Sequence, residues 1–314
     1  MSFDRIATLT LNPAIDLSLH TDTLRHESLN RVLSEREEAG GKGVNVSRLL
    51  SRLDVPNHAV ALCGLENLPY YQSLLPDEVD FRPIPFPGKI RENITLTSED
   101  GTLIKLDRSG TFSPGDALPR LEALLLSLFS GISSGLLLVC GSLPNGLAAQ
   151  EVCALLSRIA SLHPVHLGLD TLAFSLPQLQ ELRPLFLKPN EYELAKLLGI
   201  EGGTRELSAL AKAARRLPAA FVLVSLGERG LLGVKGEEAW LVPGLAVPVR
   251  STVAAGDSTA AGFSLALQRD MPFPQALRLA AACGTAAVTK PGSGMGGPEE
   301  IKEYFSKLTV EAVR

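Results

Sequence analysis

Aromatic residues and paired cysteines are scarce in this sequence. Aromatic residues make up only 5% of it, so a core must be built from Leu, Val, Ala and Ile. Such a core is typical of a parallel sheet covered by helices. The four cysteines are widely spaced and form no C-x-x-C pair. A disulfide framework and a zinc site are therefore not expected, and a reducing, cytoplasmic setting fits best.

An excess of basic charge is lacking too. The 30 Lys and Arg residues face 34 Asp and Glu residues, which gives a net charge of −4. A general nucleic-acid binder needs a basic face, so we expect no nucleic-acid partner. A local basic pocket for one phosphorylated small molecule remains allowed.

Segments that would enter a membrane are lacking as well. The opening MSFDRIATLTLNPA has no long apolar run of the kind found in signal peptides. Residues 123–150 carry no charge, but glycines and serines interrupt them and Pro144-Asn145-Gly146 closes them. They predict a helix, a turn and a buried strand rather than a membrane span. We therefore expect no membrane partner.

Apolar strands alternate with helices along most of the chain. The expected strands are Ile6–Leu11, His58–Cys63, Leu136–Cys140, Val165–Asp170, Leu185–Lys188 and Phe221–Ser225, and a hairpin-like stretch follows from Gly230 to Val242. The expected helices are Val44–Leu53, Leu118–Phe129, Ala148–Leu162, Glu191–Leu198, Leu207–Arg216, Ser258–Arg269 and Pro274–Val288. This order predicts an α/β fold whose mostly parallel sheet is covered by helices on both faces.

Two stretches break the alternation. Residues 16–38 and 90–111 alternate polar and apolar side chains, as exposed antiparallel strands do, and Asp100-Gly101 predicts a turn in the second stretch. A small sheet that stands off the main body would serve as a lid or as a dimer surface. Ordinary surface hairpins are the alternative.

The segment Ser251–Ser258 is the sharpest candidate for a reactive site. It contains Ala254-Ala255-Gly256-Asp257 and directly precedes an apolar helix. Small residues allow successive backbone N–H groups at a helix start to point at one anion, and the helix dipole strengthens the effect. Asp257 at the rim suits a general base in phosphoryl transfer. The alternative is that Asp257 only caps the helix.

Other short segments could bind a ligand. The Gly-rich turn Ala39–Asn45 opens a helix but lacks a Walker A pattern, so an ordinary helix entrance is its alternative. In Lys188–Glu193 a carboxylate could order the water around Mg²⁺, although a helix-capping pair explains the same pattern. Residues 225–230 could form a nucleotide loop or a tight turn. The run Gly292–Gly297 resembles a dinucleotide motif only superficially, because it follows a helix.

The order of these segments carries a resemblance. The matching pieces are residues 8–16 (TLTLNPAID), 40–45 (GGKGVN), 91–93 (REN), 141–144 (GSLP), 188–190 (KPN) with Glu193, 225–227 (SLG) and 255–258 (AGDS). With these motifs the chain resembles the ribokinase-like (PfkB) carbohydrate kinases over essentially its whole length. It is most similar to the hexose-phosphate branch, which includes kinases of fructose 1-phosphate, tagatose 6-phosphate and fructose 6-phosphate.

The resemblance implies a role for each site residue. The implied fold is a three-layer α/β/α kinase domain over residues 1–314, with lid strands within 16–38 and 90–111. Asp257 matches the catalytic base, and the backbone of Ala254, Ala255 and Gly256 with Asp257 matches the anion hole. The residues implied on the sugar-phosphate side are Asp16, Gly41, Lys42, Asn45, Arg91, Ser142 and Arg31. Those implied on the ATP side are Asn190, Ser225, Gly227, Gly230, Ala281 and Thr285, with Glu193 organising Mg²⁺ through bound water.

The implied activity is transfer of phosphate from ATP, with Mg²⁺, to O6 of fructose 1-phosphate, which gives fructose 1,6-bisphosphate. Tagatose 6-phosphate and fructose 6-phosphate are the alternative substrates, and a contribution of K⁺ is left open. The family also implies a homodimer through the lid. A catalytically silent nucleotide or sugar-phosphate sensor is a rival from another class, and a nicotinamide-dependent oxidoreductase is disfavoured because no Gly-rich turn follows the first strand.

One departure from the family pattern affects the anion hole. The usual Gly-Ala-Gly-Asp reads Ala254-Ala255-Gly256-Asp257 here. Because backbone N–H groups hold the anion, we expect an Ala to be tolerated if its φ stays negative.

Overall fold

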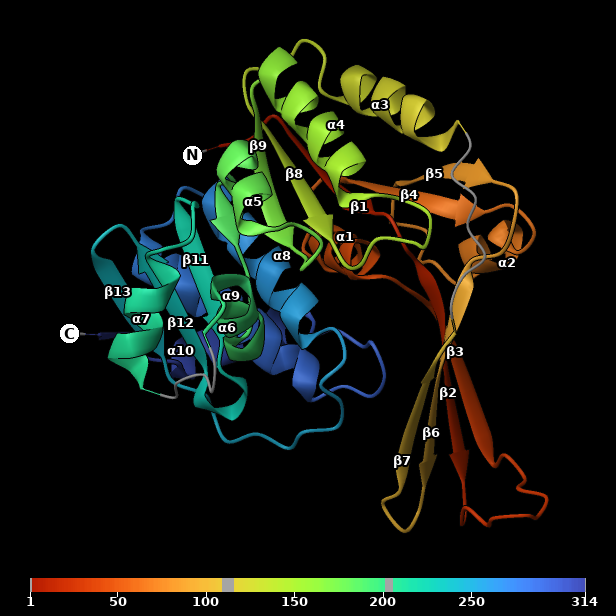
Figure 1. The fold of residues 1–314 in the computed structure, drawn as a ribbon. Helices are drawn as coiled ribbons and strands as arrows, with labels where there is room; N and C mark the ends of the chain where they lie inside the picture. The colour runs from red at the N-terminus through yellow and green to blue at the C-terminus, as the bar shows by residue number, and fades with distance from the viewer. Residues whose placement is uncertain (1, 109–115, 201–205, 314) are drawn as a thin grey trace.

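The computed structural model describes residues 2–108, 116–200 and 206–313, and its strands form two sheets (Figure 1). The larger sheet has the order β14 (Glu311–Ala312), β13 (Glu238–Val242), β12 (Leu231–Lys235), β11 (Phe221–Ser225), β10 (Phe186–Leu187), β9 (Val165–Asp170), β8 (Gly135–Cys140), β1 (Arg5–Thr10), β4 (His58–Gly64) and β5 (Phe81–Phe86). The strands from β11 to β5 run parallel, whereas β12, β13 and β14 add an antiparallel edge.

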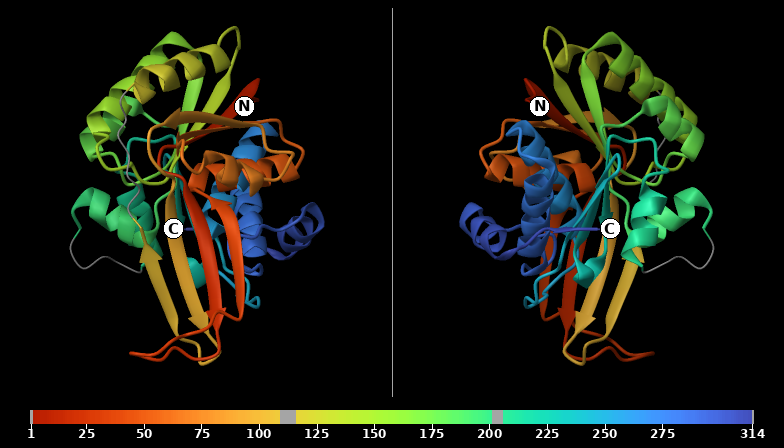
Figure 2. Two further views of the ribbon diagram at one scale, coloured as in Figure 1. Left: turned by 90° about the vertical axis from the view of Figure 1, so that its right-hand side faces the viewer. Right: turned by 90° about the vertical axis from the view of Figure 1, so that its left-hand side faces the viewer.

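Helices cover both faces of this sheet, as the two turned views show (Figure 2). One layer contains α3 (Ala117–Leu128), α4 (Ala149–Leu162), α5 (Leu176–Leu182), α6 (Glu191–Leu198) and α7 (Leu207–Ala214). The other contains α1 (Lys42–Arg52), α8 (Ala255–Gln268), α9 (Phe273–Val288) and α10 (Pro298–Lys307). Strand β8 is buried on both sides: Leu137 packs into the first layer and Leu138 into the second. The expected three-layer α/β/α fold is confirmed.

The smaller sheet, here called the lid sheet, projects from the body (Figure 1). Its order is β3 (Ser34–Gly40), β2 (Ala14–Thr21), β6 (Arg91–Ser98) and β7 (Leu103–Asp107). The expected hairpin character is only partly right, because the central strands β2 and β6 pair in parallel. Both leave the body in the same direction, and β3 and β7 return beside them. Residues 109–111 of the expected lid stretch lie outside the described residues.

The two faces of the lid sheet differ in chemistry. Cross-strand partners share a face, and on one face the register aligns polar residues: Asp16, Ser18, Asn93, Thr95, Lys105 and Asp107. The opposite face aligns apolar residues: Leu17, Leu19, Ile94, Leu96, Ile104 and Leu106. None of these six apolar side chains is buried, and Leu106 is 53% exposed.

Several elements were not anticipated from the pattern of apolar residues. Strand β5 contains Pro83 and Pro85, which lack an N–H donor, and such a strand is tolerated because it lies at the sheet edge. The short helix α2 (Leu68–Ser73) packs its Tyr71 under the lid sheet, where the hydroxyl donates to the carbonyl of Gly40 at 2.7 Å. Within the described ranges no helix is long and apolar enough to cross a membrane.

Candidate active site

A cavity of about 1040 Å³ lies between the polar face of the lid sheet and the carboxyl ends of the parallel strands. Ligands of open α/β sheets bind at this end. The cavity is lined by most of the residues expected at the site: Asp16, Gly41, Lys42, Asn45, Arg91, Asn190, Glu193, Ser225, Gly227, Gly230, Ala254, Ala255, Gly256, Asp257, Ala281 and Thr285. Residues from distant parts of the sequence therefore meet around one space.

Helix α8 begins earlier than the sequence suggested. Its first residue is Ala255, and Ala254 is the N-cap. Asp257 therefore lies in the first turn instead of capping the helix. The first intrahelical bond runs from the N–H of Ser258 to the carbonyl of Ala254 at 2.8 Å. The preceding N–H groups of residues 255–257 have no carbonyl within the helix to pair with, and they line the cavity, where an anion can accept from them.

The condition for an unstrained Ala254, a negative φ, is not met. Its φ is 60° and its ψ is 0°, in the left-handed region. A side chain with a Cβ atom pays about 1–2 kcal/mol to adopt this conformation. The turn that aims the N–H groups at the cavity is therefore strained at this residue.

Asp257 is buried at the floor of the cavity, 5% exposed. One of its oxygens, Oδ2, accepts from Nδ2 of Asn45 at 2.8 Å. Burial, together with the negative charge of Asp170, raises the pKa of Asp257 to about 6, against the lowering effects of Asn45, Lys42 and Lys188. A carboxylate with this pKa is mostly deprotonated at neutral pH and is a stronger proton acceptor than an exposed aspartate.

Two lysines near Asp257 share one carboxylate partner, Asp170. Asp170, at the end of β9, lies 3.3 Å from Nζ of Lys42 and 3.3 Å from Nζ of Lys188 through the same oxygen, Oδ1. Burial alone would raise the pKa of Asp170, but the two lysines outweigh it and lower the pKa. Lys188 is 6% exposed and lines the cavity. The position of Lys188 after a strand was noted in the sequence. Asp170, the partner of both lysines, carried no signal except that it ends a strand.

On the lid side, Asp16 is held by a short chain of hydrogen bonds. Asn93 donates to Oδ1 of Asp16 at 2.8 Å, and Nη1 of Arg91 donates to Oδ1 of Asn93 at 2.9 Å. Burial raises the pKa of Asp16, although the Asn93 hydrogen bond and the charge of Arg91 oppose it. Both Asn93 and Lys105 line the cavity. Asn93 belongs to the motif at residues 91–93 but was given no role, and Lys105 was not noted, because only the strand register places them on the same face as Asp16.

On the opposite side of the cavity, Asn190 and Glu193 form a reciprocal helix cap. Oδ1 of Asn190 accepts from the N–H of Glu193, and Oε2 of Glu193 accepts from the N–H of Asn190, each at 2.8 Å. The capping explanation of this pattern is therefore correct. It does not exclude binding, because Glu193 also lines the cavity and its second oxygen has no part in the cap.

Two expected residues lie away from the cavity. Arg31 lies in the exposed loop between β2 and β3. Ser142 accepts from Nδ2 of Asn12 at 3.0 Å and is not part of the cavity lining. In the described part of the chain, no group of three or more His, Cys, Asp or Glu side chains is arranged to hold a metal ion.

Comparison with known proteins places the chain in a family. Residues 9–300 match the family model described as pfkB family carbohydrate kinase. The chain is 32% identical to 1-phosphofructokinase of Rhodobacter capsulatus, with 98% of each chain covered, and 28% identical to that of Escherichia coli K12, with the same coverage.

The solved structures agree. Phosphofructokinase-2 from Escherichia coli in complex with potassium superposes with a TM-score of 0.86 at 28% identity, covering 96% of this chain and 98% of that one. Arabidopsis thaliana ribokinase, complexed with ribose and ATP, shares the fold with a TM-score of 0.75 at 20% identity, covering 97% of this chain and 99% of that one. The chain belongs to the PfkB family of carbohydrate kinases.

Proposed function

We propose that this sugar-phosphate kinase acts as a 1-phosphofructokinase. Asp257 removes the proton from the C6 hydroxyl of fructose 1-phosphate. The oxygen O6 then forms a bond to the γ-phosphorus of ATP as the bond between that phosphorus and the β,γ-bridging oxygen breaks, which releases ADP. Positioning and charge stabilisation supply most of the rate enhancement in such transfers.

One observation carries this proposal: a buried carboxylate of raised pKa lies in the same helical turn as a row of free N–H groups. Asp257 supplies the carboxylate, and residues 255–257 supply the N–H groups. A transferring phosphoryl group develops charge that such N–H groups stabilise. The adjacent carboxylate is then positioned to accept the proton of the attacking hydroxyl.

The two ends of the cavity support a division between acceptor and donor. Asp16 and Asn45 offer hydrogen-bonding groups for sugar hydroxyls, and Arg91 and Lys42 offer positive charge for a sugar phosphate. The proposed ATP site lies on the other side and consists of Asn190, Ser225, Gly227, Gly230, Ala281 and Thr285.

The residues present fit a magnesium ion that arrives with ATP. Two carboxylates, Glu193 and Glu228, line the donor side, and Mg²⁺ commonly uses one or two carboxylates with phosphate oxygens and waters. Glu193 would hold the ion through bound water, and the ion would neutralise phosphate charge. For potassium, replacing KCl with NaCl at constant ionic strength in the activity assay is the direct test.

A coupled ADP-release assay tests the substrate. It compares fructose 1-phosphate, fructose 6-phosphate, tagatose 6-phosphate and fructose, with Asp257→Asn as the matched inactive control. We expect the highest kcat/KM with fructose 1-phosphate and a much lower value with fructose, which offers no phosphate to Arg91 and Lys42. A preference for another ketose phosphate would reassign the substrate, and no ADP release with any of them would overturn the proposal.

We also propose that the apolar face of the lid sheet packs against a second copy of the chain. Six apolar side chains align on that face without being buried, which is a large apolar surface for a monomer. Leu106 and Leu103 form a matched pair, because they lie on one strand, on opposite faces, and are 53% and 56% exposed. Sedimentation of Leu106→Asp should show dissociation, whereas Leu103→Asp should not; a monomeric parent protein would contradict the dimer.

A reducing, cytoplasmic setting is part of the same proposal. All four cysteines are buried and free. Burial raises the pKa of Cys283 to about 12, against a small lowering by Arg269, so this thiol resists conversion to its reactive thiolate.

A further inference from the structure

A polar cluster beside the proposed base lines part of the cavity and connects the base to the lid. It consists of Glu38 on β3, Asn45 and Arg48 on α1, and Ser293 in the loop after α9. Glu38 is 7% exposed and Ser293 is 1% exposed. Asn45 and Arg48 are three residues apart on α1, so their side chains lie side by side on one helix face.

Arg48 determines which end of the Asn45 amide faces Asp257. Its Nη1 lies 3.1 Å from Oδ1 of Asn45. A guanidinium group only donates hydrogen bonds, so the oxygen of the amide must face Arg48. The amide nitrogen then faces Oδ2 of Asp257, to which it donates at 2.8 Å. With the opposite orientation the amide oxygen would face a carboxylate oxygen and repel it.

The guanidinium group is itself held in place. Nη1 also donates to Oγ of Ser293 at 3.1 Å, and Nη2 lies 3.8 Å from Oε1 of Glu38. The second oxygen of Glu38 accepts from the N–H of Ser293 at 3.0 Å. Gly292 permits this approach: its φ is +59°, and a Cβ atom there would lie 2.3 Å from Oε2 of Glu38. The glycine-rich run 292–297 therefore has a packing role toward Glu38.

We propose that Arg48 is a positioning residue for phosphoryl transfer, acting on Asp257 through the amide of Asn45. The inference rests on the proposed function of Asp257 as the base. Arg48 itself contacts Asn45, Ser293 and Glu38 and forms no hydrogen bond or ion pair with Asp257. Without Arg48 the Asn45 amide is free to rotate, and Asp257 loses its fixed hydrogen bond.

The charged environment of Asp257 sets the sign of the expected pH effect. Asp257 is faced by Lys42 and Asn45 from α1, Asp170 from β9, Lys188 from the end of β10, and Cys140 from β8. The Asn45 hydrogen bond lowers the pKa of Asp257. Losing that bond leaves burial and Asp170 less opposed, so the pKa of Asp257 rises.

The test compares Arg48→Met with Arg52→Met. Arg52 lies one turn further along α1 and donates to the carbonyl of Met295 at 3.2 Å, so it contacts the same loop without touching Asn45. For Arg48→Met we expect kcat to fall by up to about 100-fold, the scale for a misplaced reacting group, and the acid limb of kcat/KM to move to higher pH. KM for MgATP should change less than about twofold, a shift too small to indicate lost donor binding. Arg52→Met should keep the parent kcat and pH profile.

Two further variants make the result decisive. Arg48→Lys retains a donor and should recover most of the lost kcat. In an Asn45→Ala background, Arg48→Met should have little additional effect, because its route to Asp257 is already removed. An unchanged pH profile in Arg48→Met, or an equal loss in Arg52→Met, would overturn the inference.

Folding and the assignment of the base are checked separately. Circular dichroism and thermal unfolding establish that each variant is folded. Should Arg48→Met not fold, Arg48→Gln is measured instead, with the same expected shift of the acid limb. High turnover by Asp257→Asn would overturn the base itself, whereas an inactive Asp257→Asn with an unaffected Arg48→Met would overturn only the role of Arg48.

Discussion

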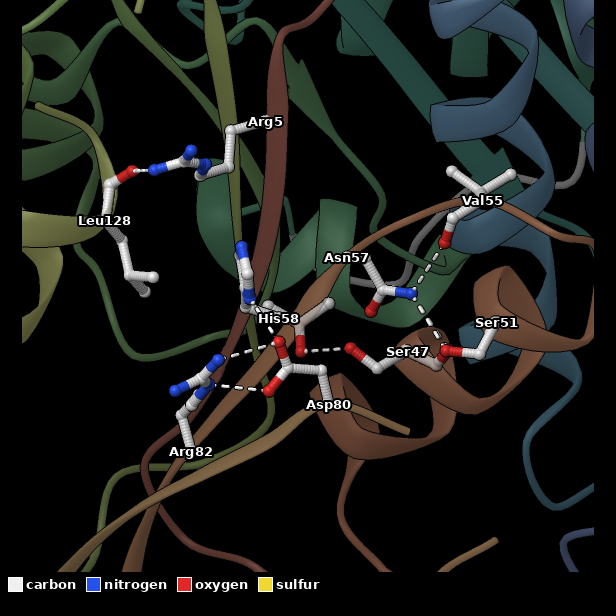
Figure 3. Close-up of polar contacts among 10 residues, drawn as sticks. Arg5, Ser47, Ser51, Val55, Asn57, His58, Asp80, Arg82 and Leu128 are labelled. Atoms are coloured by element: carbon white, nitrogen blue, oxygen red, sulfur yellow. Dashed lines mark hydrogen bonds and ion pairs between the residues drawn. The ribbon is translucent and has the colours of Figure 1, made fainter. Parts of the chain in front are cut away.

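The two ends of the central sheet carry similar polar residues in different arrangements. At the amino end, Asp80 accepts from Nε of Arg82 at 2.6 Å and from Nδ1 of His58 at 2.8 Å, and Arg5 donates to the carbonyl of Leu128 (Figure 3). Burial raises the pKa of Asp80, but the hydrogen bonds from Arg82 and His58 outweigh it and lower the pKa. The Asp80, Arg82 and His58 side chains are partly exposed, and they pair with one another.

The carboxyl end lacks this balance. Asp170 forms ion pairs with both nearby lysines, Lys42 and Lys188. Asp257 instead accepts a hydrogen bond from a neutral side chain, Asn45. The result is a pKa near 6 for Asp257, dominated by burial. The difference teaches that a paired carboxylate stabilises the fold, whereas a buried carboxylate without its own cation is available for proton transfer.

The largest expected effect comes from removing the proton acceptor. Asp257→Asn should reduce kcat by about 10³-fold, within the range that general base catalysis contributes, while MgATP affinity stays nearly unchanged. Steady-state kinetics and calorimetric titration with MgATP measure both. Turnover close to that of the parent protein would contradict the assignment of the base.

The same substitution should stabilise the fold at neutral pH. The folded pKa of Asp257, about 6, lies above its ordinary value of 3.8. The fold therefore binds the proton more tightly than the unfolded chain, and this contribution is lost as pH rises through 6. The two-unit difference corresponds to roughly 3 kcal/mol. In urea unfolding, the free energy of unfolding of Asp257→Asn should rise relative to that of the parent protein between pH 4 and pH 7. A difference that stays constant over this range would contradict the raised pKa.

The second effect concerns the shared carboxylate. Asp170→Asn removes the negative charge that raises the pKa of Asp257, so the acid limb of kcat/KM should move to lower pH. It also leaves Lys42 and Lys188 without their counter-ion, and breaking a buried pair costs about 3–5 kcal/mol. Because Lys42 is 43% exposed, we expect the lower end of that range. A shift of the acid limb toward higher pH would contradict the electrostatic role of Asp170.

Much of this carboxyl end could be predicted from the sequence, for a physical reason. Strands of unbroken apolar residues and Gly-rich helix starts are local patterns, so the parallel sheet and the segments around Asn45 and Asp257 were identified. Asp170, Asn93 and Arg48 were not identified as site residues. Their contacts depend on strand register and on helix packing between distant segments, which a single sequence does not encode locally.

The errors at finer scale have similar causes. The pattern indicated antiparallel lid strands, because alternation of polar and apolar residues does not distinguish strand direction. The start of α8 was placed at Ser258 because Ala255 and Gly256 resemble turn residues. The left-handed conformation of Ala254 was missed because only the surrounding structure imposes it.

The third prediction concerns the amino end. Asn57, 7% exposed, donates from Nδ2 to Oγ of Ser51 and to the carbonyl of Val55, each at 3.0 Å (Figure 3). Asn57→Ala should cost about 1–3 kcal/mol, because buried groups lose their partner, and should leave kcat unchanged. Urea unfolding and the ADP-release assay measure the two quantities. A large loss of kcat with normal stability would break the separation between the two ends.

The smallest expected effect concerns the carboxyl end again, at the strained backbone of Ala254. Ala254 has a φ of 60°, which glycine adopts without a steric penalty. Ala254→Gly should relieve the strain, while the greater freedom of glycine in the unfolded chain offsets part of the gain. We therefore expect a net increase of about 0.5–1 kcal/mol in the free energy of unfolding. Asp54→Gly is a matched control, because Asp54 also has a positive φ, of 57°, but lies after α1 and outside the cavity lining. Both variants should gain stability, and both should retain kcat, since the N–H groups of residues 255–257 keep their direction. A loss of stability in Ala254→Gly alone would mean that the methyl group of Ala254, which packs in the core beside α8, outweighs its backbone strain.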